Sequence, residues 1–272
     1  MLPSKFYAEF NSEEKAIEYF KSAYQKKITS CKHCKQAKLR WSDRRVGWKC
    51  SSCSKFHSLK SLTFIKDSNL SLLTWLEVIY LLTETKKTLS ICEITRLIKI
   101  NRYKTVFYMV QKIRKVMGEV NLKAYFSKRS AIEVGIEKEC DYFSVFYGKQ
   151  VAGGLDFIRL EIPQYLHNRY RRMSTELRGK ESFRNKKILL SRFKVYEIYP
   201  KYLRKSIESR TLYKNWERKI LSNFLRELKG VFHHVSFMYL QNVLDEYCFK
   251  YNFRYGKEDK FRTLIRIASE SS

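Results

Sequence analysis

Two pairs of cysteines constrain this chain more than any other feature of its sequence. Cys31-Lys-His-Cys34 and Cys50-Ser-Ser-Cys53 are both CxxC motifs, and residues 35–49 separate them. Each motif places two sulfurs on one side of a tight turn, and a tetrahedral Zn²⁺ ion takes four thiolates at about 2.3 Å. The spacing predicts a zinc ribbon in which a hairpin joins the two turns. The alternative is a redox-active pair of CxxC motifs, but the βαβ pattern of a thioredoxin-like protein does not surround them.

The charge of the chain predicts a polyanionic partner. Fifty-five Lys and Arg oppose 27 Asp and Glu, which gives a net charge of +28. Such a charge favours nucleic acid over an anionic membrane surface. Between Lys26 and Lys60, eleven basic residues accompany one acid, Asp43, so we expect this surface to contact phosphates. A merely solvated charged surface is the alternative. The residues that we assign to double-stranded DNA here are Lys32, Lys35, Lys38, Arg40, Arg44, Arg45 and Lys49.

The remaining metal-binding side chains have simpler interpretations. His33 and His57 are expected at the surface or against the DNA backbone, because four cysteines already complete a metal site. Cys92, Cys140 and Cys248 lie within apolar patterns and are expected to be buried free thiols, which is typical of a reducing compartment. The charged start has no apolar signal region, and the most apolar window, residues 72–82, is too short to cross a bilayer. We expect a soluble intracellular protein that is located with DNA and does not associate with membranes.

Capping and periodicity predict helices on both sides of the cysteines. Asn11-Ser-Glu-Glu14 predicts a helix over 12–24, and the hairpin strands are expected at 38–41 and 46–49. Further helices are predicted over 72–84, from Ser90 to about 98, and from Asn101 to about 117. Three such helices favour a helix-turn-helix whose third helix enters the major groove, with a plain three-helix bundle as the alternative. The basic residues that we assign to DNA on the third helix are Arg102, Lys104, Lys112, Arg114 and Lys115.

The pattern changes after residue 130. Strands are predicted at 131–136, 142–147, 157–162 and 187–190, followed by helices at 214–228 and 237–251, which indicates an α/β or α+β domain. Between Arg169 and Lys194, ten basic residues accompany two acids. This run is either a further DNA contact, through Arg169, Arg171 and Arg172, or a flexible solvated loop.

Three blocks of sequence resemble one known family. They are residues 10–20 leading into the cysteines, residues 62–70 with Trp75 and 80–82, and Gly230-Val-Phe-His-His-Val-Ser236 with Gln241 and Asn252. The chain thereby resembles Merlin-type DDE transposases and their bacterial insertion-sequence relatives. The resemblance implies an α+β multidomain protein: an N-terminal helix at 1–25, a zinc ribbon at 26–64, a helix-turn-helix at 68–120 and an RNase H-like domain at 130–272. It also implies a homo-oligomer.

The same resemblance implies that the catalytic centre is lost. In that family three carboxylates hold two Mg²⁺ ions, which activate water or a DNA 3′-hydroxyl. The corresponding positions here are Gly135, Ser191 and Arg218, and none of these side chains replaces a carboxylate ligand. Bound Mg²⁺ is therefore not expected. Displaced acids that keep an active enzyme open as an alternative are Glu133, Glu137, Asp141, Glu197 and Glu217.

The leading hypothesis is a zinc-dependent DNA-binding protein derived from a transposase and catalytically inactive, either domesticated or decaying. The first alternative is an active Mg²⁺-dependent transposase or nuclease that uses displaced acids. The second is a ribbon module for protein assembly or regulation.

Overall fold

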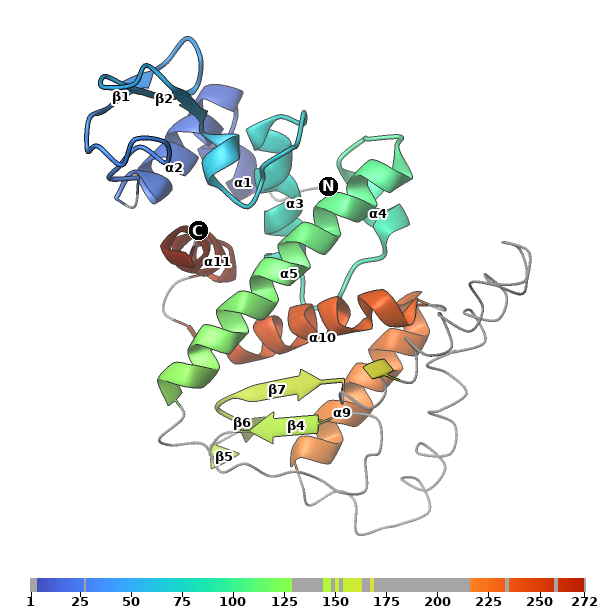
Figure 1. Cartoon of the computed structure of the whole chain (residues 1–272). Helices are drawn as coiled ribbons and strands as arrows, with labels where there is room; N and C mark the ends of the chain where they lie inside the picture. Colours follow the sequence, from blue (N-terminus) through green and yellow to red (C-terminus); the bar gives the residue numbers. More distant parts are fainter. Residues whose placement is uncertain are drawn as a thin grey trace, which may run out of the picture. The chain divides into compact units, whose positions relative to one another are not determined.

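The computed structural model separates the chain into two compact units, each of which mixes α-helices with small antiparallel sheets (Figure 1). The first unit combines residues 1–120 with residues 256–272, and the second comprises residues 121–255. The predicted last domain runs to residue 272, whereas the structure groups 256–272 with the N-terminal part of the chain. The residues that the structure describes are 4–26, 28–128, 144–147, 150–151, 154–162, 167–168, 216–232, 235–256 and 259–271.

The helices of the first unit enclose an aromatic cluster. The ring of Phe261 stacks on Tyr19 at 5.8 Å between centroids, and it lies 5.8 Å from Phe10 and 5.6 Å from Tyr80. Helices from both ends of the sequence therefore share one core. The helices are α1 (Ser4–Glu9), α2 (Glu13–Gln25), α3 (Leu72–Glu84), α4 (Ile91–Leu97), α5 (Tyr103–Lys128, through Val120 in this unit) and α11 (Lys260–Ser271).

Serine hydroxyls begin three of these helices, each by accepting a backbone N–H three residues ahead. The pairs are Ser12 with Lys15 at 3.4 Å, Ser71 with Thr74 at 3.0 Å and Ser90 with Glu93 at 3.2 Å. The predicted start at Ser90 and the predicted bounds of α3 are confirmed. The predicted cap at Asn11 is one residue early, because the Ser12 hydroxyl performs this role.

A three-stranded antiparallel sheet lies between α2 and α3 in the sequence. Its strands are β1 (Leu39–Ser42), β2 (Gly47–Cys50) and β3 (Phe56–Ser58), in the order β1-β2-β3. A 3₁₀ turn over Lys60–Leu62 follows. The predicted hairpin is confirmed with a shift of one residue in each strand, and β3 was not predicted. Gly47 is required where β2 meets β3, because a Cβ there would lie 2.4 Å from the carbonyl oxygen of His57.

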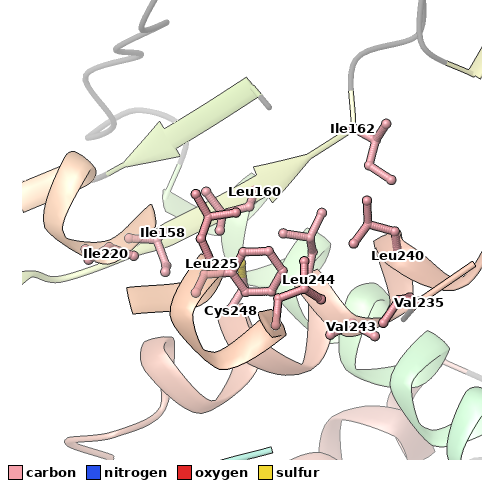
Figure 2. Close-up of a cluster of buried hydrophobic side chains, with 12 residues drawn as sticks. Ile158, Leu160, Ile162, Ile220, Leu225, Val235, Leu240, Val243, Leu244 and Cys248 are labelled. Carbon is pink, nitrogen blue, oxygen red and sulfur yellow. The ribbon is translucent and has the colours of Figure 1, made fainter. Parts of the chain in front are cut away.

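The second unit is built on two paired strands and the helices beside them. Strands β4 (Ser144–Tyr147) and β7 (Ile158–Glu161) are antiparallel, with Val145 opposite Leu160. Figure 2 shows apolar side chains of β7 and of helices α9 and α10 meeting in one buried cluster that includes Leu160, Leu225 and Leu244. The other elements are the strand pair β5 (Gln150–Val151) and β6 (Gly154–Leu155), α9 (Trp216–Glu227), the π-helical turn Leu228–Phe232 and α10 (Phe237–Asn252).

Two amide side chains of α10 satisfy the edge of β7 that faces away from β4. Asn252 accepts the Ile158 N–H at 2.8 Å and donates to the Ile158 carbonyl at 2.9 Å. Gln241 accepts the Ile162 N–H at 3.0 Å and donates to the Leu160 carbonyl at 3.1 Å. Asn252 follows Gln241 by eleven positions, which is close to three helical turns, so both amides lie on one face of α10.

Several predictions differ from the structure or fall outside the described residues. Helices α1 and α11 were not predicted, and α5 continues to Lys128 instead of ending near residue 117. Cys248 is buried as predicted, but Cys92 is exposed. The predicted strands at 131–136 and 187–190 and the position of Cys140 lie outside the described residues. Within the described part of the chain, every helix is too short or too polar to traverse a bilayer.

Candidate metal centre and its basic surroundings

The two CxxC motifs form turns with the same backbone hydrogen bonds. In each turn the first cysteine donates its N–H to the carbonyl five residues on, and its own carbonyl accepts the N–H four residues on. The bonds are Cys31 to Gln36 at 2.9 Å and Lys35 to Cys31 at 2.9 Å, then Cys50 to Lys55 at 2.9 Å and Ser54 to Cys50 at 3.0 Å. We call residues 31–36 and 50–55 the cysteine turns. Their correspondence extends to the left-handed residues Lys35 (φ 61°) and Ser54 (φ 58°).

The turns bring the four predicted sulfurs together. All four Sγ atoms lie within 4.8 Å of one another, with Cys31 and Cys53 at 3.6 Å and Cys34 and Cys50 at 3.5 Å. None of the four is in a disulfide. Four sulfurs at about 2.3 Å from a tetrahedral ion are about 3.8 Å apart, so the cluster matches the dimensions of a four-thiolate site. These cysteines can hold a metal ion such as zinc.

Backbone amides prepare the first cysteine of each turn for the thiolate form. The N–H of Cys34 lowers the pKa of Cys31, and the N–H of Cys53 lowers the pKa of Cys50 to about 6. Cys34 accepts the N–H of Gln36, which lowers its pKa, but burial and the adjacent Cys50 and Cys53 outweigh this and raise it to about 12. A divalent cation at this position would offset the cost of burying the Cys34 thiolate and would favour loss of its proton.

His57 lies closer to the cluster than we predicted. Trp41, Trp48 and His57 form one row across the inner face of the three-stranded sheet. The Nε2 atom of His57 is 3.2 Å from the Sγ of Cys31. His57 is therefore a neighbour of a ligand sulfur and not a surface contact, because β3 directs it inward. His33 is exposed, as expected.

The outer face of the same sheet carries exposed positive charge in register. Arg40 lies directly opposite Lys49, which lies opposite Phe56, and both basic side chains are exposed. The guanidinium of Arg45 stacks over the Phe56 ring at 4.1 Å. Like charges directly opposite each other destabilise a sheet, so this register opposes folding of the sheet. We call Arg40, Arg45, Lys49 and Phe56 the outer row.

The structure tests the exposure of the other predicted DNA contacts. Lys32, Lys35, Lys38 and Arg44 are exposed, as are Arg102, Lys104 and Lys115 of the α5 region. Lys112 is half-buried and donates to the carbonyl of Lys66. Arg114 corrects the prediction, because only 1% of it is exposed. It lies about 100° around the helix from Lys115, on the side of Val110 and Met117.

Sequence reasoning missed exposed aromatic residues at the start of α5. Tyr103 is 49% exposed and Tyr108 is 61% exposed. Phe107 lies between them, stacked on Tyr103 at 6.2 Å and edge-on to Tyr108 at 5.6 Å. The available signal was helical spacing, since Tyr108 lies one turn after Lys104 on the same face.

The positions that the resemblance assigns to catalytic acids lie mostly outside the described residues. Gly135, Ser191, Arg169, Arg171 and Arg172 lie outside the described residues, as do Glu133, Glu137, Asp141 and Glu197. Arg218 and Glu217 lie in α9, and at these two positions only the backbone is described. Within the described ranges, the four cysteines are the only group of His, Cys, Asp or Glu side chains with ligand atoms close enough to share a metal ion.

Comparisons with known proteins give no further information about the metal centre or the basic residues around it. No protein-family model matches the chain, and neither a curated protein nor a solved structure shows significant similarity to it.

Proposed function

We propose that this chain is a zinc-dependent protein that binds double-stranded DNA, and that the cysteine turns with β1–β3 form a zinc ribbon that presents its outer row to DNA. The observation that carries the proposal is the position of the four sulfurs, within 4.8 Å of one another, beneath a sheet whose opposite face bears Arg40 and Lys49 in register. Metal binding and anion binding are thus joined in one small module.

Zinc is the metal that this ligand set favours. Four thiolates are soft donors, and a tetrahedral S₄ site selects Zn²⁺ or iron–sulfur chemistry over hard cations such as Mg²⁺. The lowered pKa of Cys50, about 6, supports thiolate formation near neutral pH. A structural zinc ion in such a site contributes about 10–16 kcal/mol of binding free energy.

Duplex DNA is the partner that the charge and the helices favour. Helices α4 and α5 are separated by residues 98–102, which is compatible with a helix-turn-helix. Lys104, Tyr108 and Lys115 lie on the exposed face of α5, and we propose that this face enters the major groove. The basic run that includes Arg169 would add affinity independent of sequence.

We further propose that the chain descends from a transposase and lacks its cutting centre. The support is the sequence resemblance, together with Gly135, Ser191 and Arg218 at the expected acidic positions. The second unit would then be a degenerate RNase H-like domain. Purified protein that binds terminal DNA should leave it uncut with Mg²⁺ or Mn²⁺, and nicking or strand joining would refute this part of the proposal.

The DNA-binding proposal is tested by coupling metal content to affinity. The full chain is purified, its zinc is quantified, and its affinity for random-sequence duplex DNA is measured by fluorescence anisotropy across salt concentrations. We expect a steep loss of affinity with salt, and a further loss when Cys31 and Cys34 are both replaced by Ser. Unchanged DNA affinity in a folded, zinc-free double variant would show that the zinc ribbon is not the part of the protein that recognises DNA.

A further inference from the structure

An imidazole distinguishes the two cysteine turns from each other. The Sγ of Cys31 has the Nε2 of His57 at 3.2 Å in addition to the backbone amides of its own turn. Cys50 is the equivalent cysteine of the second turn, and its neighbours are the amides of Ser52 and Cys53 and the sulfur of Cys34. The Cys31 sulfur therefore has an imidazole as a neighbour, whereas the neighbours of the Cys50 sulfur are backbone amides and cysteine sulfurs.

The β2–β3 register sets the position of His57 in the sheet. His57 lies opposite Trp48 in the β2–β3 register, and Trp48 contacts Trp41 edge-on at 4.7 Å. A cavity of about 150 Å³ borders the imidazole and is lined by Tyr24, Leu39 and Leu62 among others. The imidazole is half-buried.

The chemistry of the pair defines which atom carries the proton. A metal-bound thiolate is only an acceptor, so the Nε2 atom must be the donor. Four thiolates on one divalent cation leave a net charge of −2, and each N–H that points at a sulfur reduces the negative charge on it. Such outer contacts orient ligands and tune the metal that they hold.

We propose that His57 is a positioning residue of the metal centre, whose Nε2–H donates to the thiolate of Cys31 and keeps that ligand on the metal. The inference rests on the metal-binding part of the proposed function and is independent of DNA. His57 thereby protects the Cys31 ligand, since a sulfur with less negative charge reacts more slowly with electrophiles, including the protons that release a thiolate from a metal.

The test uses three variants of the full chain. His57→Phe keeps a ring of similar size and removes the donor, and His57→Gln keeps an N–H near the position of Nε2. His33→Phe is the matched control, because His33 lies in the first cysteine turn with an exposed side chain. His57→Met is a second donor-free variant if circular dichroism shows that His57→Phe is not folded.

Two readouts separate donation from packing. Zinc affinity and the rate of zinc transfer to a chelator report how firmly the ligands hold, and a 10–100-fold change is typical when such a partner is removed. In the Co²⁺-substituted protein, the sulfur-to-cobalt charge-transfer bands report the charge on sulfur. For His57→Phe we expect zinc release at least tenfold faster and charge-transfer bands at lower energy, with recovery in His57→Gln and no change in His33→Phe.

The outcomes that overturn the inference differ from those that overturn the proposed function. A wild-type chain that binds neither Zn²⁺ nor Co²⁺ removes both. A wild-type chain that binds the metals, together with a folded donor-free variant that has the same release rate and the same bands, removes the role of His57 alone. Equal losses in the Phe and Gln variants would assign His57 to packing and would also reject donation.

Discussion

At the scale of single residues, the turn between β1 and β2 contains a residue in an unfavourable conformation. Val46 has φ 48°, in the left-handed region, where a β-branched side chain is rare. The backbone around it is held by two bonds, from the Val46 N–H to the Asp43 carbonyl and from the Leu59 N–H to the Val46 carbonyl. The adjacent Gly47 cannot exchange roles with it, because Gly47 is required for close contact with β3.

We therefore expect Val46→Gly to stabilise the zinc-loaded protein. The left-handed conformation costs an L-residue on the order of 1 kcal/mol, which glycine avoids, and the lost burial of a half-exposed valine offsets part of the gain. Denaturant unfolding of the zinc-loaded chain measures the change. Val46→Ala should fall between Val and Gly, and a less stable glycine variant would contradict the assignment of strain to this residue.

Asp245 of α10 is a residue whose protonation should make the stability of the protein depend on pH. Burial raises its pKa to about 7, although Gln241 donates to its carboxylate at 3.0 Å. The folded state therefore keeps a proton that the unfolded chain releases near pH 4. Stability conferred by this group should fall as pH rises from about 4 to about 7, by at most about 1.4 kcal/mol per pH unit, and should then be constant.

Asp245→Asn removes this titration while it keeps an oxygen that accepts from Gln241. We expect the variant to match the wild type near pH 4 and to be more stable than it at pH 8. Urea unfolding of the second unit at several pH values tests this, and carbon NMR of the Asp245 carboxyl gives its pKa directly. Parallel pH profiles for both proteins would exclude a raised pKa.

At the scale of elements, carboxylate side chains of one helix accept hydrogen bonds from the first N–H groups of another helix. The carboxylate of Glu13 in α2 accepts the N–H groups of Leu72 at 2.7 Å and Leu73 at 2.9 Å, at the start of α3. Glu84 of α3 accepts the N–H of Phe261 at 3.0 Å, at the start of α11. Each contact satisfies N–H groups that have no acceptor within their own helix, and it places negative charge at the positive end of that helix.

Replacing Glu13 by Ala should destabilise the first unit by about 1–2 kcal/mol, as the loss of a helix cap does. Glu18→Ala is the control, because Glu18 is an exposed acid of the same helix. Thermal unfolding of both variants makes the comparison. Equal effects would mean that the tertiary cap contributes no more than surface charge.

The three-stranded sheet makes a prediction in which folding and binding change in opposite directions. Lys49→Glu would pair an acid with Arg40 across β1 and β2, which should stabilise the sheet by about 0.2–1 kcal/mol. The same change should weaken DNA binding and reduce the slope of log affinity against log salt by about 1. Lys86→Glu alters net charge equally at an exposed residue outside the sheet. Equal losses of DNA affinity in the two variants would mean that the outer row contributes to DNA binding only through the net charge of the chain.

At the scale of the whole molecule, sequence patterns correctly predicted the features that depend on residues close together in the chain. The CxxC spacing predicted the sulfur cluster, and Ser90 with Glu93 predicted the start of α4. The bounds of α3 followed from a clear apolar stripe ended by polar residues.

Features that depend on distant partners were missed. Helix α11 is positioned by Phe261, whose aromatic partners lie in the first 80 residues, and β3 has only three residues to show a pattern. The contact of His57 with Cys31 depends on the β2–β3 register, and the burial of Arg114 depends on which arc of α5 faces the core. Neither the strand register nor the buried face of the helix can be derived from composition or motif spacing alone.

We propose that four sulfurs of this chain hold one zinc ion. X-ray absorption spectroscopy at the zinc edge, on protein of known zinc content, tests this most directly. We expect one zinc per chain with four sulfur neighbours at about 2.3 Å and the imidazole of His57 outside the coordination shell. Protein that purifies without zinc, or a shell in which nitrogen or oxygen replaces a sulfur, would contradict it.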